Sequence, residues 1–523
     1  MTDHNTTVHY HGLSQKMTPY ADGTVISQWP IAPGKWFEYQ IKPTQEDVGS
    51  RYYHAHVGLQ AMSASGPLII EDDNPPFEFD EERTVMIADW YNKTEDVMTK
   101  GLLANPFVWL GSANHVVVNG KAYTGEAGWT DPPHVIDVDY GKTYLLRWIG
   151  AQGTMYYSVA ILGHNQRLVE ADGTYLRPLG VQTLEFGAGQ RYGTLLKTKS
   201  AADIDRDKKN GCYWVRLEAQ WRKPSTHGWA LLRYPSCKVT TARPPTVNNS
   251  ETLLPVANFG WVQSELAVHP KSNIRAMPSD AEVTRRQIIS IQQDHTFPGS
   301  LGDVWRQNHY VYNEETTTRV PYLIQLYLNM TEKPSYTRAM NNSSATGWDE
   351  LSKTYVAKQG EVLDIVLINR PSLLSRQVEI HPMHFHSSKA WHLASGHGNF
   401  SDKALAAARR SGYKNPVPRD TFNIWPEPGS SLNATDILPT GGAGGWTVLR
   451  YEVTAEESGV WPLHCHILAH QVMGMSSTFA FDVDGLASRM DGHDPNYLIY
   501  GKNVMSPLSF KELGVNNVTA GAS

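Results

Sequence analysis

Histidines occur in closely spaced pairs at four places in this chain. Each pair has the form His-x-His, and the last one encloses a cysteine. In a β-strand, residues two apart project from the same face, so each pair presents two imidazoles to one point in space. Four such strands supply eight nitrogen ligands, which suits a cluster of three metals holding two, three and three of them. The eight residues are His9, His11, His54, His56, His384, His386, His464 and His466.

The cysteine inside the last pair points to the opposite face of its strand. Cys465 is followed by His470 and Met475 in the spacing Cys-x4-His-x4-Met, and His381 stands just before the third pair. Two imidazoles, a thiolate and an axial thioether form the ligand set of a blue copper centre. Met473 competes for the axial position, but the spacing favours Met475. The pattern predicts a single-metal site on the other side of the strand from the cluster.

Histidines are common and usually not ligands, so a structural interpretation has to be weighed. Ten of the 21 histidines fall in these motifs, and the others lie outside any such spacing. One His-x-His pair alone would be a weak signal. Four pairs, with a cysteine in the fourth, favour copper binding.

Several longer segments resemble the multicopper oxidases, in particular the fungal and plant ascorbate oxidase and laccase branch of that family. They are HYHGLSQ, GSRYYHAHVGLQ, VEADGTYLRP, HPMHFH and LHCHILAHQVMGM. The resemblance runs from near the N-terminus to about residue 485. It implies an oxidase with four copper ions, one of type 1, one of type 2 and two of type 3, that takes electrons from a small-molecule reductant and passes them to O2.

The resemblance assigns the ligands by motif position. Cys465 is bonded through one backbone unit to His464 and His466, which gives electrons a short route between the two sites. The type 1 copper is expected on His381, Cys465, His470 and Met475, the type 2 copper on His9 and His384, and the type 3 pair on His11, His54 and His466 and on His56, His386 and His464.

Oxygen reduction consumes protons, so nearby carboxylates are of interest. Asp22 matches a family acid that assists at the three-copper site, whereas Leu468 stands where many relatives have a second acid. Either Asp22 and water serve alone, or an acid elsewhere substitutes. Glu170 and Asp172 align with the region where relatives place a carboxylate beside the type 1 histidine, here His470. The alternative that each is a turn residue is equally open.

The composition predicts a secreted all-β protein. At 523 residues the chain is too long for one core. Its net charge of -6 gives no reason to expect nucleic acid, and no stretch approaches the length of a transmembrane helix. We expect three cupredoxin-like Greek-key β-sandwich domains and one short helix over 402–413. The expected divisions are domain 1 at 1–75, domain 2 at 76–240, a linker at 241–283, domain 3 with the type 1 copper at 284–485, and a tail at 486–523.

Cysteines and glycosylation motifs also point to the secretory pathway. Cys212 and Cys237 flank two strand-like runs, so a disulfide is plausible, although two buried free thiols remain the alternative. Nine Asn-x-Ser/Thr motifs occur. No signal peptide is visible and the first histidine pair arrives at residue 9. We therefore expect a late start that omits a leader and the opening strands of domain 1; an intracellular variant is the alternative.

The sequence leaves three functions open. The first is an oxidase of phenols, polyphenols or ascorbate, which includes phenol-coupling enzymes of fungal secondary metabolism. The second is a ferroxidase-type metal oxidase, which would want several convergent carboxylates or a Met-rich insert, and no such insert is visible. The third is a non-catalytic copper-binding protein, against which the complete set of ligands argues. The oligomeric state stays open.

Overall fold

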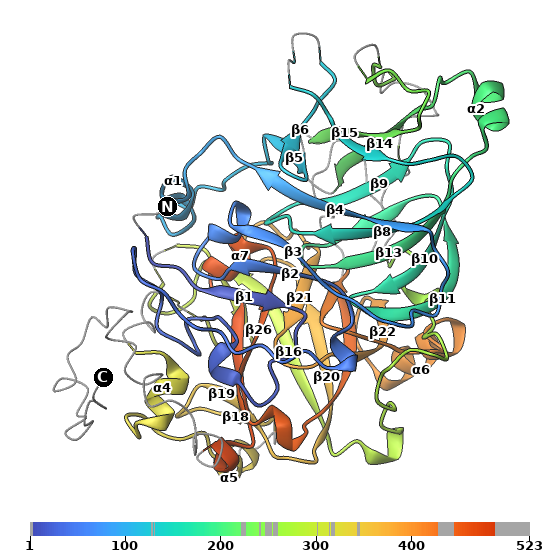
Figure 1. Cartoon of the computed structure of the whole chain (residues 1–523). Helices are drawn as coiled ribbons and strands as arrows, with labels where there is room; N and C mark the ends of the chain where they lie inside the picture. The colour runs from blue at the N-terminus through green and yellow to red at the C-terminus, as the bar shows by residue number, and fades with distance from the viewer. Residues whose placement is uncertain are drawn as a thin grey trace, which may run out of the picture.

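The computed structural model describes residues 4–486 except for 127–128, 130, 221–225, 240–241, 246–253, 255–259, 301, 313, 315–319, 342–345 and 427–443. Parts of the expected linker, 241–283, and the expected tail from residue 487 onward lie outside the described residues. Strands dominate the described chain and short helices connect them, which confirms the all-β expectation (Figure 1). None of the described helices is long and apolar enough to cross a membrane.

The N-terminal part forms one antiparallel sheet with the strand order β1-β2-β3. Because β2 lies in the middle, it is hydrogen-bonded on both sides, which holds His54 firmly in place. His56 follows directly after the strand, and its amide donates to the backbone oxygen of Thr7. Two short 3-10 helices, η1 (Pro19–Ala21) and η2 (Gln45–Asp47), lie in the long connection from β1 to β2. The strands are β1 (Val8–His11), β2 (Gly49–Ala55) and β3 (Ser65–Ile70).

The middle part is a sandwich of two sheets. The seven-stranded sheet has the order β11-β10-β13-β8-β4-β5-β6 and the five-stranded sheet the order β12-β9-β14-β15-β7. The first contains β4 (Glu81–Trp90), β5 (His115–Val118), β6 (Lys121–Ala122), β8 (Thr143–Gly150), β10 (Gln166–Ala171), β11 (Thr174–Val181) and β13 (Arg191–Lys197). The second contains β7 (His134–Asp137), β9 (Tyr156–Ile161), β12 (Leu184–Phe186), β14 (Cys212–Gln220) and β15 (His227–Arg233).

A disulfide joins Cys212 at the start of β14 to Cys237 beyond the end of β15. The two strands are antiparallel neighbours, so the ends that carry the cysteines meet. The expected pairing is confirmed. The helices of this part are α1 (Glu95–Leu102) and α2 (Ala201–Asp207).

The C-terminal part is a second sandwich, built from two six-stranded sheets. One sheet, in the order β17-β16-β20-β25-β22-β23, contains β16 (Arg285–Asp294), β17 (Val304–Gln307), β20 (Val362–Asn369), β22 (Ala390–His397), β23 (Val417–Arg419) and β25 (Gly445–Glu452). The other, in the order β18-β19-β27-β26-β21-β24, contains β18 (Trp348–Asp349), β19 (Thr354–Ala357), β21 (His381–Phe385), β24 (Thr421–Ile424), β26 (Gly459–Cys465) and β27 (Ser476–Phe481).

Short helices decorate this second sandwich. The helix expected over 402–413 is confirmed as α6 (Asp402–Ser411), which begins at the cap residue Ser401, whose hydroxyl accepts a hydrogen bond from the amide of Ala404. The others are α4 (Tyr322–Tyr327), α5 (Tyr336–Met340) and α7 (Leu468–Val472).

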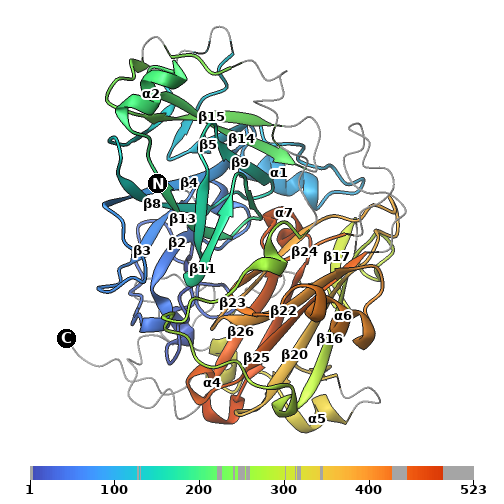
Figure 2. The ribbon, with the colours of Figure 1, turned by 90° about the vertical axis from the view of Figure 1, so that its right-hand side faces the viewer.

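One continuous cluster of buried apolar side chains joins the two sandwiches and reaches the N-terminal part. It contains Met62 near β3, Trp148 on β8 and Trp461 on β26. In Figure 2 the green middle part lies above the yellow-to-red C-terminal part, and the blue N-terminal strands lie beside both. The shared core fixes the three parts relative to one another, so strands from opposite ends of the sequence can deliver ligands to one place.

Candidate metal centres

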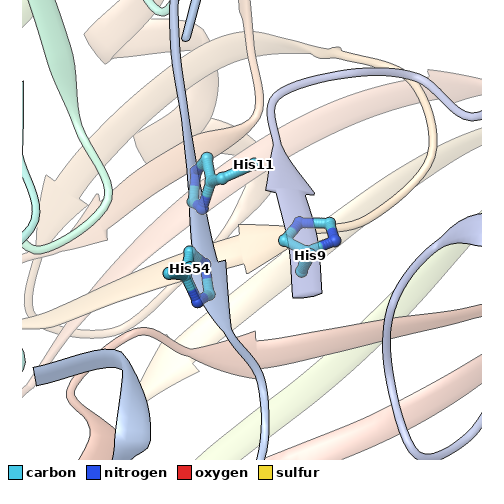
Figure 3. A group of neighbouring side chains, drawn as sticks. All are labelled: His9, His11 and His54. Carbon is cyan, nitrogen blue, oxygen red and sulfur yellow. The ribbon is translucent and has the colours of Figure 1, made fainter. Parts of the chain in front are cut away.

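The first two histidine pairs lie on neighbouring strands. In the antiparallel pairing of β1 with β2, His9 stands directly opposite His54. His11 is two residues after His9 and therefore lies on the same face. Figure 3 shows how the rings of His9, His11 and His54 gather at these two strands. The local pairing alone thus brings three imidazoles together.

The other two pairs are arranged in the same way at the other end of the chain. In the pairing of β21 with β26, His384 stands opposite His464, and Met383 stands opposite Cys465. Alternation then separates two sets of ligands. His384 and His464 face the N-terminal histidines, while Cys465 lies on the opposite face, together with His381.

Eight histidines from the two ends of the chain meet in one buried cluster. The Nε2 atoms of His9 and His384 are 3.3 Å apart. On the other side, His464 Nε2 lies 3.3 Å from His56 Nε2 and 3.0 Å from His386 Nε2. The cluster is completed by His11, His54 and His466, whose ring centroids are 4.9 to 5.7 Å apart. The distances of 3.0 to 3.3 Å between Nε2 atoms suit nitrogens that coordinate the same metal ion.

The electrostatics of the cluster also fit bound cations. Burial lowers the pKa of His54 to about 3 and that of His464 to about 4, so the rings are neutral and can donate lone pairs near pH 7. His11 Nδ1 and His54 Nε2 are buried and have no hydrogen-bond partner. Buried polar nitrogens are normally satisfied, and a metal ion would satisfy these two.

A carboxylate and two carbonyl groups orient several rings from behind. His9 Nδ1 donates to the backbone oxygen of Asp22 at 2.6 Å, and His386 Nδ1 donates to the Asp22 carboxylate at 2.9 Å. His384 Nδ1 donates to the backbone oxygen of Asp420 at 2.9 Å. Because the outer nitrogens carry the protons, the inner nitrogens of these rings are available to a metal. Asp22 is fully buried, and it contacts the cluster as the sequence predicts.

The second centre lies on the other face of β26. The Cys465 sulfur is 3.8 Å from His381 Nδ1 and 3.6 Å from His470 Nδ1, and all three side chains are buried. The backbone oxygen of Met475 accepts a hydrogen bond from the Cys465 amide, and the residue is fully buried. Met473 instead lines a cavity of about 610 Å³, together with Val472 of α7. This placement agrees with Met475 as the axial residue.

The two carboxylates expected near the substrate lie elsewhere. Glu170 is 1% exposed and accepts hydrogen bonds from the Ser50 amide and from Arg147. Asp172 is fully buried and pairs with Arg419. Both side chains turn inward to arginines, and neither reaches the surface, so the structure speaks against the expected contact with a reductant.

A different carboxylate, which the sequence analysis missed, contacts the type 1 histidine. Glu379 Oε2 lies 3.1 Å from His470 Nε2, and its side chain is 16% exposed. Its position two residues before His381 is a signal that could have revealed it. Trp305, which has no such signal, packs its ring centroid 4.8 Å from His381 and 4.6 Å from His470. Leu468, where relatives have an acid, is buried and packs close to Gly153.

A hydroxyl and an acid near the cluster were also missed. The Tyr52 hydroxyl lies 3.1 Å from His466 Nε2. Tyr52 precedes His54 by two residues, so alternation could have placed it on the same face. The Asp420 carboxylate lies 3.2 Å from His11 Nε2 and belongs to no recognisable motif.

Known proteins resemble this chain over most of its length. Three family models, each described as multicopper oxidase, match residues 1–75, 81–235 and 318–484. The chain is 35% identical over 526 residues to multicopper oxidase aurL2 of Gibberella zeae, covering 95% of this chain and 84% of that protein. It is 32% identical to laccase-like multicopper oxidase 1 of Thermothelomyces thermophilus, covering 96% and 83%. It is 29% identical to L-ascorbate oxidase of Nicotiana tabacum, covering 90% and 80%.

A solved structure shares the fold. The crystal structure of Fet3p, described as a multicopper oxidase that functions in iron import, superimposes with a TM-score of 0.68 at 21% identity, covering 97% of this chain and 86% of that one. Taken with the family models, the buried histidine cluster and the Cys465 centre lead to one conclusion: the chain belongs to the multicopper oxidase family, copper-dependent oxidoreductases, and has the residues to hold four copper ions.

Proposed function

We propose that this oxidase takes single electrons from small organic reductants, namely phenols, polyphenols or ascorbate, at the type 1 site. The observation that carries the proposal is the buried Cys465 centre, which meets a partly exposed carboxylate at the outer edge of His470. When bound, copper supplies the one-electron redox steps and the reduction of O2 to water. The ligands are those assigned by motif position: type 1 on His381, Cys465, His470 and Met475, type 2 on His9 and His384, and type 3 on His11, His54, His466, His56, His386 and His464.

The residues next to Glu379, which contacts His470, favour an organic reductant. A cavity of only about 10 Å³ beside Glu379, too small to enclose a reductant, has largely apolar walls that include Tyr156, Ile380 and Ile467. Among the described residues that line it, Glu379 is the one acid. A metal oxidase would want several carboxylates that converge on the substrate ion. One acceptor carboxylate with apolar neighbours suits a phenol or enediol hydroxyl, which can donate a hydrogen bond to it, better than a metal ion.

We propose that Asp22 assists proton transfer during the reduction of O2. Its carboxylate holds His386 Nδ1 and its backbone oxygen holds His9 Nδ1, so it touches rings on both sides of the cluster. A buried acid in this position can hold a proton at a carboxylate oxygen beside the place where O2 is reduced.

Secretion is proposed on independent grounds. The disulfide between Cys212 and Cys237 is typical of proteins that mature in an oxidising compartment. The nine Asn-x-Ser/Thr motifs agree with passage through the secretory pathway.

A reductant panel tests the proposal. Oxygen uptake by one copper-loaded sample should be fast with catechols, hydroquinones or ascorbate and slow with Fe(II), because His470 contacts one carboxylate, that of Glu379, rather than several convergent ones. Phenol-coupling activity in a biosynthetic pathway would appear as dimeric phenol products. Fast uptake with Fe(II) and none with the organic reductants would contradict the proposal and favour a metal oxidase.

Glu379→Gln should selectively lower kcat/KM for organic reductants. The amide replaces a charged hydrogen bond worth about 1.5–3 kcal/mol with a neutral one worth about 0.5–1.5 kcal/mol, so kcat/KM for phenols should fall roughly 10-fold, mainly through KM. Ferrocyanide, which has no hydroxyl to donate, should be oxidised at nearly the wild-type rate. Glu82→Gln, which removes the charge of a partly exposed carboxylate paired with Arg147, is the matched control. Equal losses for phenols and ferrocyanide would show that Glu379 does not bind the reductant.

Met475→Leu should raise the potential of the type 1 copper. A thioether on the axis donates to the metal, so its removal destabilises Cu(II) more than Cu(I). Each tenfold loss of preference for Cu(II) raises a one-electron potential by about 59 mV. The variant should then oxidise phenols that the wild type leaves untouched. A redox titration checks this, with Met473→Leu as the control; a rise in that control and none in Met475→Leu would assign the axial position to Met473.

A further inference from the structure

Asp420 lies next to the histidine cluster and contacts both a histidine of the cluster and an arginine. It stands between β23 and β24, and its Oδ1 atom lies 3.2 Å from His11 Nε2. Arg191, the first residue of β13, grips the same carboxylate with two hydrogen bonds of 2.6 Å each. Both side chains are almost completely excluded from solvent. A bidentate pair of this kind is among the stronger polar interactions in proteins.

The ion pair joins three parts of the chain. Arg191 comes from the middle sandwich, Asp420 from the C-terminal sandwich and His11 from the N-terminal sheet. Arg191 is itself held in place, because its Nε atom donates to the backbone oxygen of Ser50 on β2. Gly12 leaves room for the pair: a Cβ atom at that position would lie 2.4 Å from Arg191 Nη2. The side chains around the ion pair are closely packed and leave no space for a side chain at Gly12.

The hydrogen bonds determine which nitrogen of His11 carries the proton. Two oxygens face Nε2: Asp420 Oδ1 at 3.2 Å and the Thr421 hydroxyl at 3.0 Å. The Thr421 hydroxyl donates its proton to Asp420 at 2.9 Å, and the carboxylate, paired with Arg191, is an acceptor. Neither oxygen can therefore donate to Nε2. The ring has to donate from Nε2, which leaves the lone pair on Nδ1.

The ring cannot turn to escape this choice. It stacks on His384 with a centroid distance of 3.7 Å and an interplanar angle of 15°, and on Tyr52 at 4.7 Å and 29°. Its Nδ1 atom is buried and has no hydrogen-bond partner. Arg191 and the Thr421 hydroxyl both donate hydrogen bonds to the Asp420 carboxylate, which makes it the hydrogen-bond acceptor behind the His11 ring.

We propose that the Arg191–Asp420 pair is a positioning pair for the three-copper site: it holds His11 in the tautomer that offers Nδ1 to one copper of the type 3 pair, and it couples that ligand to the contact between all three parts of the chain. The inference rests on the proposed ligand assignment and adds two residues that no motif identifies. Asp420 thereby acts through His11 and not as the proton donor missing at Leu468.

The test compares Asp420→Asn with a matched control. The amide can donate to His11 Nε2, which moves the ring proton to Nδ1 and removes the ligand. Asp364→Asn is the control, because Asp364 also forms a buried bidentate pair with an arginine, Arg450, and lies outside both centres. Copper per chain, the EPR-silent type 3 pair, the blue absorption and the rate of copper loss to a chelator are measured on holoenzymes.

Asp420→Asn should keep the blue colour and lose the magnetically coupled pair. Copper loss from the cluster should be roughly 10- to 100-fold faster than in Asp364→Asn, as is usual when a partner behind a metal ligand is removed. An intact coupled pair and a copper-loss rate within about twofold of the control would overturn the proposal.

A milder variant decides the matter if Asp420→Asn does not fold. Arg191→Lys keeps a positive charge beside Asp420 but loses the bidentate grip, so copper loss should still be faster than in the wild type; an unchanged rate would overturn the proposal. Copper analysis of the wild type distinguishes a failure of the proposed ligand assignment from a failure of the positioning role. Wild-type protein without four coppers would refute the proposed ligand assignment itself, whereas a four-copper wild type with an unaffected Asp420→Asn refutes the positioning role alone.

Discussion

The alternation of side chains along one strand is the constraint on which this structure depends. Cys465 ends β26 between His464 and His466, and it has to face away from them because neighbouring residues in a strand project to opposite sides. One strand therefore ends in two metal centres, separated by a peptide unit on either side. The pairing of β26 with β21 then brings His381 to the sulfur and His384 to the cluster. No other secondary structure would give this separation with so few residues.

Convergence imposes the remaining demands on the fold. The cluster takes four histidines from the N-terminal sheet and four from the last sandwich, so the shared core must hold these parts in register. Burial keeps the imidazoles neutral, as the lowered pKa values of His54 and His464 show. Neutral rings need partners on their outer nitrogens, and Asp22, Asp420 and backbone carbonyls provide them. The metal ions would add a cross-link between the two ends of the chain, so apo protein should be looser at this contact.

Sequence alone predicts that the paired histidines converge, because period-two spacing is a local property. The all-β fold, the helix at Asp402–Ser411 and the bond between Cys212 and Cys237 are likewise accessible from local patterns. Tyr52 and Glu379 also stand two residues from a ligand, and closer attention to the spacing would have found them.

The rest depends on contacts between distant segments. Arg191 and Asp420 are 229 residues apart and carry no spacing signal. Glu170 and Asp172 were expected beside His470, but buried arginines draw both carboxylates inward. Asp172 has a positive φ of 46° in the tight turn between β10 and β11, and only the tertiary structure shows which way its side chain points.

The most direct test of this arrangement removes the sulfur of Cys465, which lies on the strand that supplies ligands to both centres. Cys465→Ser should abolish the blue colour and the oxidation of organic reductants, while the cluster on the opposite face of β26 keeps its coppers and their EPR signature. Metal analysis and EPR of this variant beside the wild type measure both effects at once. Retention of the blue absorption, or loss of all copper together with the colour, would contradict two independent centres built on the two faces of one strand.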